Sequence, residues 1–177
     1  MKQKTGQSEK DSQSKAAQPQ DALSQFEMGN NHFYGIGVPQ DFEKAFECWE
    51  KAASQGHAQA QYKTGLSYSN GLGVPQNYEK AFEWYKKAAQ QGIVEAQYNL
   101  GNCYFTGQGT EQDTDKAINW YRIAAAQGSA DALFELGNFH AAAKNYEQAV
   151  EYFIKAAEKG HKGAANRLQE ILSISKS

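Results

Sequence analysis

The sequence repeats itself every 36 residues, and this period limits the possible folds more than any other feature. The segment 65–91 recurs one step earlier and one step later along the chain. The register is marked by glycines at Gly29, Gly65, Gly101 and Gly137. A fixed period of about 20 to 50 residues is typical of stacked supersecondary units. We therefore expect a solenoid whose function depends on its surface.

Each repeat contains two apolar stripes at helical spacing, which predicts a pair of helices per unit. A glycine such as Gly71 can end the first helix in the left-handed conformation. Four side chains are expected to cap the second helices with an oxygen: Asp41, Asn77, Asp113 and Asn145. The second helices are expected to end at Gly56, Gly92, Gly128 and Gly160. The predicted helices span 21–34, 41–54, 57–70, 77–90, 93–106, 113–126, 129–142, 145–158 and 161–173.

Small and aromatic residues alternate in a way that explains how such helices pack. Gly65 and its equivalents let the two helices of a unit approach closely, and alanines do the same between units at Ala52, Ala88, Ala124 and Ala156. Eight aromatic residues are expected to fill the core: Phe26, Tyr62, Tyr98, Phe134, Trp49, Tyr85, Tyr121 and Phe153.

The carboxyl end is expected to be closed by a capping helix, because a solenoid needs a cap at each end. Its predicted apolar face comprises Ala164, Ala165, Leu168, Ile171 and Leu172. Its predicted water-facing side chains are Lys162, Arg167, Gln169 and Glu170.

Composition narrows the functional classes. The 177 residues carry a formal charge of −2 with acidic and basic side chains mixed, which argues against binding to nucleic acid. No apolar run approaches the ~18 residues of a membrane span, and no secretory segment is visible near Met1, so a cytoplasmic location is expected. Residues 1–20 are rich in Gln, Lys and Ser and are predicted to form a disordered tail.

The motif of the second unit resembles the Sel-1-like repeat, a branch of the tetratricopeptide superfamily. The resemblance lies in Gly65-Leu66-x-Tyr68-x-x-Gly71-x-Gly73-Val74, followed by Asn77-x-x-Lys80-Ala81 and Trp84-Tyr85-x-Lys87-Ala88-Ala89-x-Gln91-Gly92. It implies an all-α, right-handed α/α superhelical solenoid of about four helix pairs plus the capping helix. The expected units are 21–56, 57–92, 93–128 and 129–160, with the cap at 161–173 and a tail at 174–177. The fourth unit departs from the motif, since the short turn 143–145 replaces the longer loop.

The resemblance also implies that the first helices line a concave face on which a protein partner binds. Counting from each unit glycine selects the candidate partner-binding residues Asn30, Tyr34, Gln59, Ser69, Asn70, Glu95, Asn102, Phe105 and Asn138. The asparagines stand out, because a carboxamide offers both a donor and an acceptor to a peptide bond. The alternative is that they are solvated or bond locally.

This face is expected to be neutral to acidic with aromatic patches, which suits an extended peptide or a helix with apolar and basic side chains. A clamp for a terminal carboxylate is not expected, because the basic residues for it are lacking. The predicted function is that of a non-catalytic adaptor or scaffold.

Catalytic chemistry finds little support. His32 and His140 take the place of Tyr68 and Tyr104 and are interpreted as packing residues rather than metal ligands; no cofactor or metal site is expected. Cys48 and Cys103 are expected to be separate buried thiols, unlike the disulfides of cysteine-rich relatives that have been labelled β-lactamase-like. The alternatives left open are such an enzyme, a cell-wall-related enzyme, a self-assembling rod and a host-directed effector.

Overall fold

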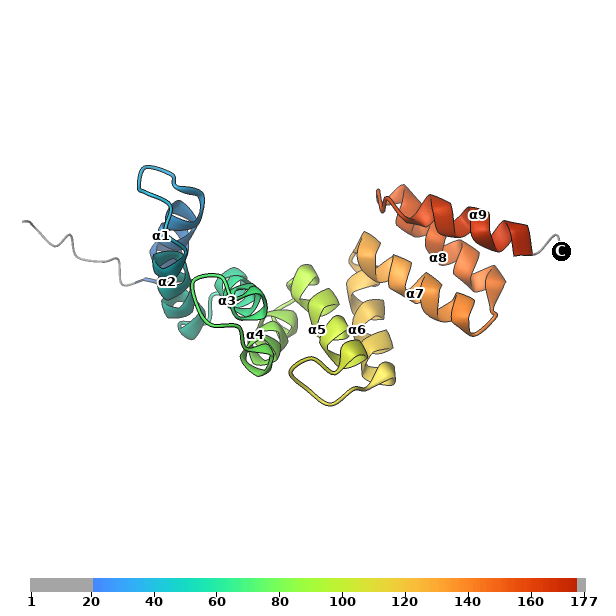
Figure 1. Ribbon diagram of the computed structural model, residues 1–177, viewed down its shortest axis with the longest axis horizontal. Helices are drawn as coiled ribbons and strands as arrows, with labels where there is room; N and C mark the ends of the chain where they lie inside the picture. The colour runs from blue at the N-terminus through green and yellow to red at the C-terminus, as the bar shows by residue number, and fades with distance from the viewer. Residues whose placement is uncertain (1–20, 175–177) are drawn as a thin grey trace, which may run out of the picture.

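The computed structural model describes residues 21–174, and within this range every regular element is an α-helix. The helices are α1 (Ala22–Tyr34), α2 (Phe42–Ser54), α3 (Ala58–Asn70), α4 (Tyr78–Gln90), α5 (Val94–Thr106), α6 (Thr114–Ala126), α7 (Ala130–Ala142), α8 (Tyr146–Glu158) and α9 (Ala164–Ile174). Figure 1 shows the helix pairs following one another along a curved path. The fold is an all-α solenoid, as predicted. The predicted disordered tail 1–20 and residues 175–177 of the predicted tail 174–177 lie outside the described residues.

Side-chain oxygens start three of the second helices, as predicted. Asp41, Asn77 and Asp113 accept hydrogen bonds from the backbone nitrogens of Lys44, Lys80 and Lys116 at 3.0, 2.8 and 2.9 Å. These bonds satisfy one of the otherwise unpaired amides in each first turn. The boundaries of the second helices are therefore set locally by the sequence.

The prediction that Asn145 caps α8 in the same way is wrong. Its side chain accepts no capping bond, and its Nδ2 instead donates to Oε1 of Gln148 at 3.1 Å. The cause is the short turn before α8, in which Lys144 adopts a φ of 59° and Asn145 a φ of −87° and ψ of 72°. The other three caps have extended backbone with φ near −150°.

The unit glycines allow the two helices of each pair to meet. A Cβ atom at Gly65 would lie 2.7 Å from the Tyr85 ring, and one at Gly137 would lie 2.6 Å from the Phe153 ring. The second-helix aromatic residues and the interunit alanines are buried, as predicted: Trp49, Tyr85, Tyr121, Phe153, Ala52, Ala88, Ala124 and Ala156. The first-helix aromatic residues are only partly buried: Phe26, Tyr62, Tyr98 and Phe134. The core therefore lies between the two helices of a pair and between neighbouring units.

Buried glutamine side chains form hydrogen bonds between neighbouring units. Gln61 donates to the backbone oxygen of Ala53 at 3.2 Å and accepts from Nε2 of Gln91 at 2.8 Å. Gln97 donates to the backbone oxygen of Ala89, and its Oε1 accepts from Gln127 at 2.7 Å. Because each amide is bonded, these polar groups can be buried at the unit boundary without a large desolvation penalty.

The capping helix α9 packs against unit four along a narrower stripe than predicted. Ala164 and Ile171 are buried and Leu168 is partly buried. Ala165 and Leu172 were assigned to the same face, but both are exposed, with Leu172 at 52%. Only one edge of the predicted apolar face is therefore buried against unit four.

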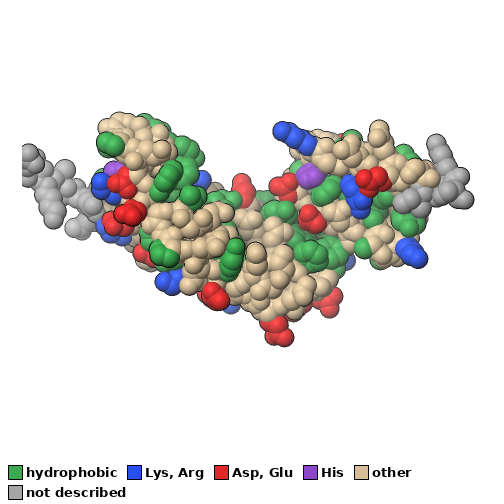
Figure 2. Space-filling model, in the orientation of Figure 1, with side chains coloured by type: hydrophobic (Ala, Val, Ile, Leu, Met, Phe, Trp, Pro, Cys, Tyr) green, Lys and Arg blue, Asp and Glu red, His purple; other side chains and the backbone are tan. Residues whose placement is uncertain are grey.

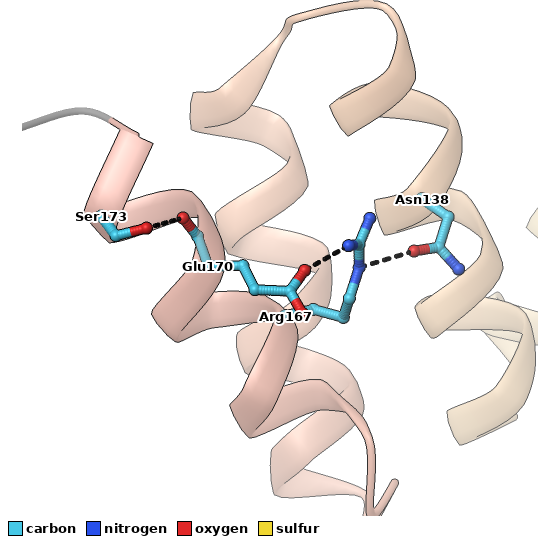
Figure 3. A network of polar contacts seen from close by, with 4 residues as sticks. All are labelled: Asn138, Arg167, Glu170 and Ser173. Atoms are coloured by element: carbon cyan, nitrogen blue, oxygen red, sulfur yellow. Dashed lines mark hydrogen bonds and ion pairs between the residues drawn. The ribbon is translucent and has the colours of Figure 1, made fainter. Parts of the chain in front are cut away.

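Arg167 does not point into water as predicted. Its guanidinium carbon lies 5.8 Å from the centre of the Phe153 ring, and its Nε donates to Oδ1 of Asn138 at 3.3 Å. The same guanidinium is paired with Glu170 on α9 (Figure 3). Arg167 therefore anchors the cap to the first helix of unit four.

The two cysteines are free and buried, as predicted. Burial raises the pKa of the Cys48 thiol, and it raises the pKa of the Cys103 thiol to about 11. Both side chains act as packing groups.

Candidate partner-binding surface

The predicted partner-binding residues all lie on the first helix of a pair. Asn30 and Tyr34 are on α1; Gln59, Ser69 and Asn70 are on α3; Glu95, Asn102 and Phe105 are on α5; and Asn138 is on α7. Figure 2 shows the surface hollowed on one side, between the end formed by α1 and α2 and the end formed by α8 and α9.

The side-chain oxygen of each of the three unit asparagines accepts a hydrogen bond from another residue of the protein. Oδ1 of Asn30 accepts from Nε1 of Trp49 at 3.2 Å, and Oδ1 of Asn102 accepts from the Tyr121 hydroxyl at 2.6 Å. Oδ1 of Asn138 accepts from Arg167 (Figure 3). Its Nδ2 donates to Glu135 at 3.3 Å. Each of these side-chain oxygens therefore has a partner within the protein, which agrees with the alternative of internal bonding, and the binding of a ligand by the asparagines stays a prediction.

These bonds also explain why a poor helix former recurs at this register. The hydrogen bond offsets the low helix propensity of Asn; it comes from a ring side chain of the second helix at Asn30 and Asn102, and from Arg167 on α9 at Asn138. In unit two, Leu66 takes this place, and the Tyr85 hydroxyl contacts Ser69 instead.

A hollow of about 250 Å³ lies across three neighbouring units. It is lined by Tyr62 on α3, by Val94, Glu95, Tyr98 and Asn99 on α5, and by Ser129 and Asp131 at the start of α7. Glu95 was predicted for this surface, whereas Tyr62 and Tyr98 were assigned only to packing. Their partial burial leaves part of each ring facing the hollow.

The hollow is acidic. Burial raises the pKa of Tyr62, and the negative charge of Glu95 raises it further. Burial also raises the pKa of Tyr98, with a further increase from the carboxylates of Glu135 and Asp131. Carboxylates close enough to act on both tyrosines would also favour a positive charge placed between the rings.

Other predicted residues lie away from this hollow. Tyr34 is 59% exposed at the end of α1, and Asn70 is exposed and donates to the backbone oxygen of Leu66. Phe105 is 41% exposed and meets the edge of Phe139 at 5.3 Å between ring centres. The structure thus distributes the predicted residues along the solenoid instead of gathering them into one pocket.

Two further hollows lie beside the second helices. One of about 400 Å³ is bordered by Phe82, Lys86, Tyr104 and the loop before α6, and one of about 350 Å³ by Arg122, Leu133, Tyr152 and Lys155. Both have lysine at the rim, so their charge differs from that of the hollow on the first helices.

Three of the four histidines stack on aromatic rings. His140 stacks on Tyr152 at 5.2 Å, and His57 and His161 stack on Phe26 and Phe134. Across residues 21–174 no group of three or more His, Cys, Asp or Glu side chains is placed to hold a metal ion. None of the helices in this range is long and apolar enough to cross a membrane.

The described repeats match the Sel1 repeat family at residues 22–57, 58–93, 94–129 and 130–161. No curated protein is significantly similar in sequence.

Several solved structures are similar, among them these three. The protective antigen c5321 of uropathogenic Escherichia coli strains, which displays an SLR fold, is 37% identical with a TM-score of 0.84; the match covers 88% of this chain and 34% of that one. A Sel1 repeat protein from Oxalobacter formigenes is 32% identical with a TM-score of 0.80, covering 85% and 63% of the two chains. This chain thus spans about a third of the first protein and less than two thirds of the second. The Helicobacter pylori cysteine rich protein B, 23% identical with a TM-score of 0.54 over 63% of this chain and 86% of that one, shares only the fold.

Proposed function

This chain belongs to the Sel1 repeat family, and on that premise we propose that it is a non-catalytic interaction module that binds a segment of a partner protein along its first helices. The observation that carries the proposal is the hollow between α3, α5 and α7, where two tyrosine rings and two carboxylates converge. Such a surface can contact both an apolar side chain and a cationic one.

The chemistry of the hollow favours a partner segment with basic and apolar side chains. A Lys or Arg side chain placed between Tyr62 and Tyr98 would gain cation–π contact with the rings. Glu95 and Asp131 would then lie beside its charge. The acidic rim would also raise the rate of encounter with a basic segment and make binding depend on salt.

A carboxylate-terminated ligand is disfavoured on the same grounds. Arg167 is near Asn138, but its guanidinium is already bonded to that residue and to Glu170. A terminal carboxylate at this hollow would face Glu95 and Asp131, so electrostatic repulsion would oppose it.

The proposal predicts that neutralising the hollow weakens capture of the partner. The double variant Glu95→Gln and Asp131→Gln removes two negative charges from the hollow. A matched control, Glu83→Gln and Glu151→Gln, removes two exposed charges from α4 and α8. Quantitative mass spectrometry after crosslinking in cells should show the captured partner falling about tenfold for the first variant, equivalent to about 1.4 kcal/mol. Equal recovery with both variants would place the binding site elsewhere.

A further inference from the structure

The loop between the helices of a unit has a repeated role in units two and three. A Cβ atom at Gly73 would overlap the backbone carbonyl of Phe42, in the first turn of α2. A Cβ atom at Gly109 would overlap the carbonyl of Tyr78, in the first turn of α4. In both units the loop glycine therefore contacts the preceding unit, at the first turn of that unit's second helix. We call this glycine contact the seat of the helix. The close approach requires glycine, because no side chain fits there.

Unit one has the same loop without the neighbour. Gly37 adopts a φ of 70°, compared with 72° at Gly73 and 76° at Gly109. Its φ therefore matches that of the two glycines that contact a helix. A Cβ atom at Gly37 would meet no atom within 4 Å among the described residues. Within residues 21–174, no helix therefore packs against this glycine.

Four apolar residues lie close to Gly37 in the sequence. We call Tyr34, Ile36, Gly37, Val38 and Phe42 the unit-one tip. Ile36 is 60% exposed and Phe42 is 40% exposed, and hydrophobic side chains are visible at this end of the molecule in Figure 2.

The equivalent positions in the other two units are less apolar. Unit two has Asn70, Leu72, Val74 and Tyr78, and unit three has only polar residues, Thr106, Gln108, Thr110 and Thr114. The unit-one loop is therefore the most apolar of the three, with four apolar residues at these positions. An exposed apolar cluster of this kind is typical of an interaction site.

We propose that the unit-one tip is a docking site for the first turn of an α-helix from a partner protein. The repeat itself defines the occupant's chemistry, since the same loop seats a first turn twice within this chain. Both seated turns contact the glycine through the backbone carbonyl of an aromatic residue, Phe42 or Tyr78. The partner helix should carry an aromatic or large apolar residue at the same position.

A second copy of this chain does not supply that helix in the register of the solenoid. Tyr146 in the first turn of α8 is the equivalent of Phe42 and Tyr78. However, α9 packs against α8 with Ala164 and Ile171 buried. It occupies the place that α1 of another copy would need.

The side of α1 that would face the partner suggests reversible contact. This side of α1 carries Ser24, Asn31 and His32. The equivalent residues of α3 are Ala60, Ser67 and Tyr68, and all three are buried. Tyr68 makes an edge contact with Phe46 and donates to Glu50 at 3.0 Å. The more polar surface of α1 resembles the interface of a partner that binds and leaves more than that of a permanent neighbour.

The test uses the full chain and a helix-stabilised peptide with the sequence of residues 77–92, whose first turn is seated on Gly109 in the native fold. Backbone amide NMR should show saturable shifts centred on Gly37. Ile36→Asp should weaken the dissociation constant at least about tenfold. The matched control Gln108→Asp makes the same replacement at the equivalent position of unit three and should bind as the wild type does. A peptide carrying Tyr78→Asp should bind weakly.

Several results would overturn the proposal. The absence of saturable shifts would do so, and so would shifts that persist in Ile36→Asp. Peptide binding that occurs only after residues 1–20 are removed would identify this segment of the chain itself as the occupant. Light scattering that shows self-association lost in Ile36→Asp would identify a second copy. The Glu95→Gln and Asp131→Gln variant should bind this peptide normally, so the outcome is separate from that of the hollow on the first helices.

Discussion

Removal of α9 by truncation after Gly160 should lower the free energy of unfolding by about 4 kcal/mol or more. The truncation removes the burial of Ala164 and Ile171 and exposes their neighbours Phe153 and Ala156 to water. Burial of a large aliphatic side chain contributes ~1.5–3 kcal/mol, and Arg167 no longer bonds to Asn138. Because a solenoid is stabilised by contacts between neighbours, unit four should lose most of its protection.

Circular dichroism during urea unfolding measures this effect, and amide hydrogen exchange locates it. Leu172→Ser is the matched control on the same helix, because Leu172 is exposed. It should change the unfolding free energy by no more than about 0.5 kcal/mol. A truncated chain that unfolds at the same urea concentration as the full chain would contradict the capping role of α9.

Gly73→Ala should destabilise the protein far more than Gly37→Ala. Both glycines have positive φ, which costs an alanine ~1–2 kcal/mol. At Gly73 the new methyl group would also overlap the carbonyl of Phe42, and overpacking against backbone adds ~1–3 kcal/mol. We expect a loss of about 3 kcal/mol or more at Gly73 and about 1 kcal/mol at Gly37.

Urea unfolding of the two variants tests this difference directly, since each serves as the other's control. Hydrogen exchange in Gly73→Ala should increase first at the start of α2, because the loop of unit two contacts the first turn of that helix. Equal losses of unfolding free energy in the two variants would show that contact between this loop and the preceding unit does not stabilise the protein.

Much of the fold could be predicted because its signals are local and repeated. The caps at Asp41, Asn77 and Asp113 and the left-handed glycine Gly71 act within a few residues of themselves. The match to the Sel1 repeat family confirms the resemblance of the motif. Asn145 was the exception, because the shortened turn before it changed the backbone that a capping side chain needs.

The contacts of the candidate site were harder to predict. Asn30 and Asn102 bond to residues 19 positions away, and Asn138 bonds to a residue 29 positions away. A sequence pattern places these residues on a register but does not reveal which acceptor atoms are already used. The hydroxyls of Tyr62 and Tyr98, where Phe26 and Phe134 have none, were the signal that these two rings border a polar hollow.

Site-specific photocrosslinking in cells tests the central claim, that a partner lies along the first helices, most directly. A photoreactive phenylalanine derivative would replace exposed Gln59 on α3 or, as the matched position on a second helix, exposed Glu83 on α4. We predict a discrete protein adduct from position 59 and none from position 83. An adduct formed only from position 83 would contradict the account.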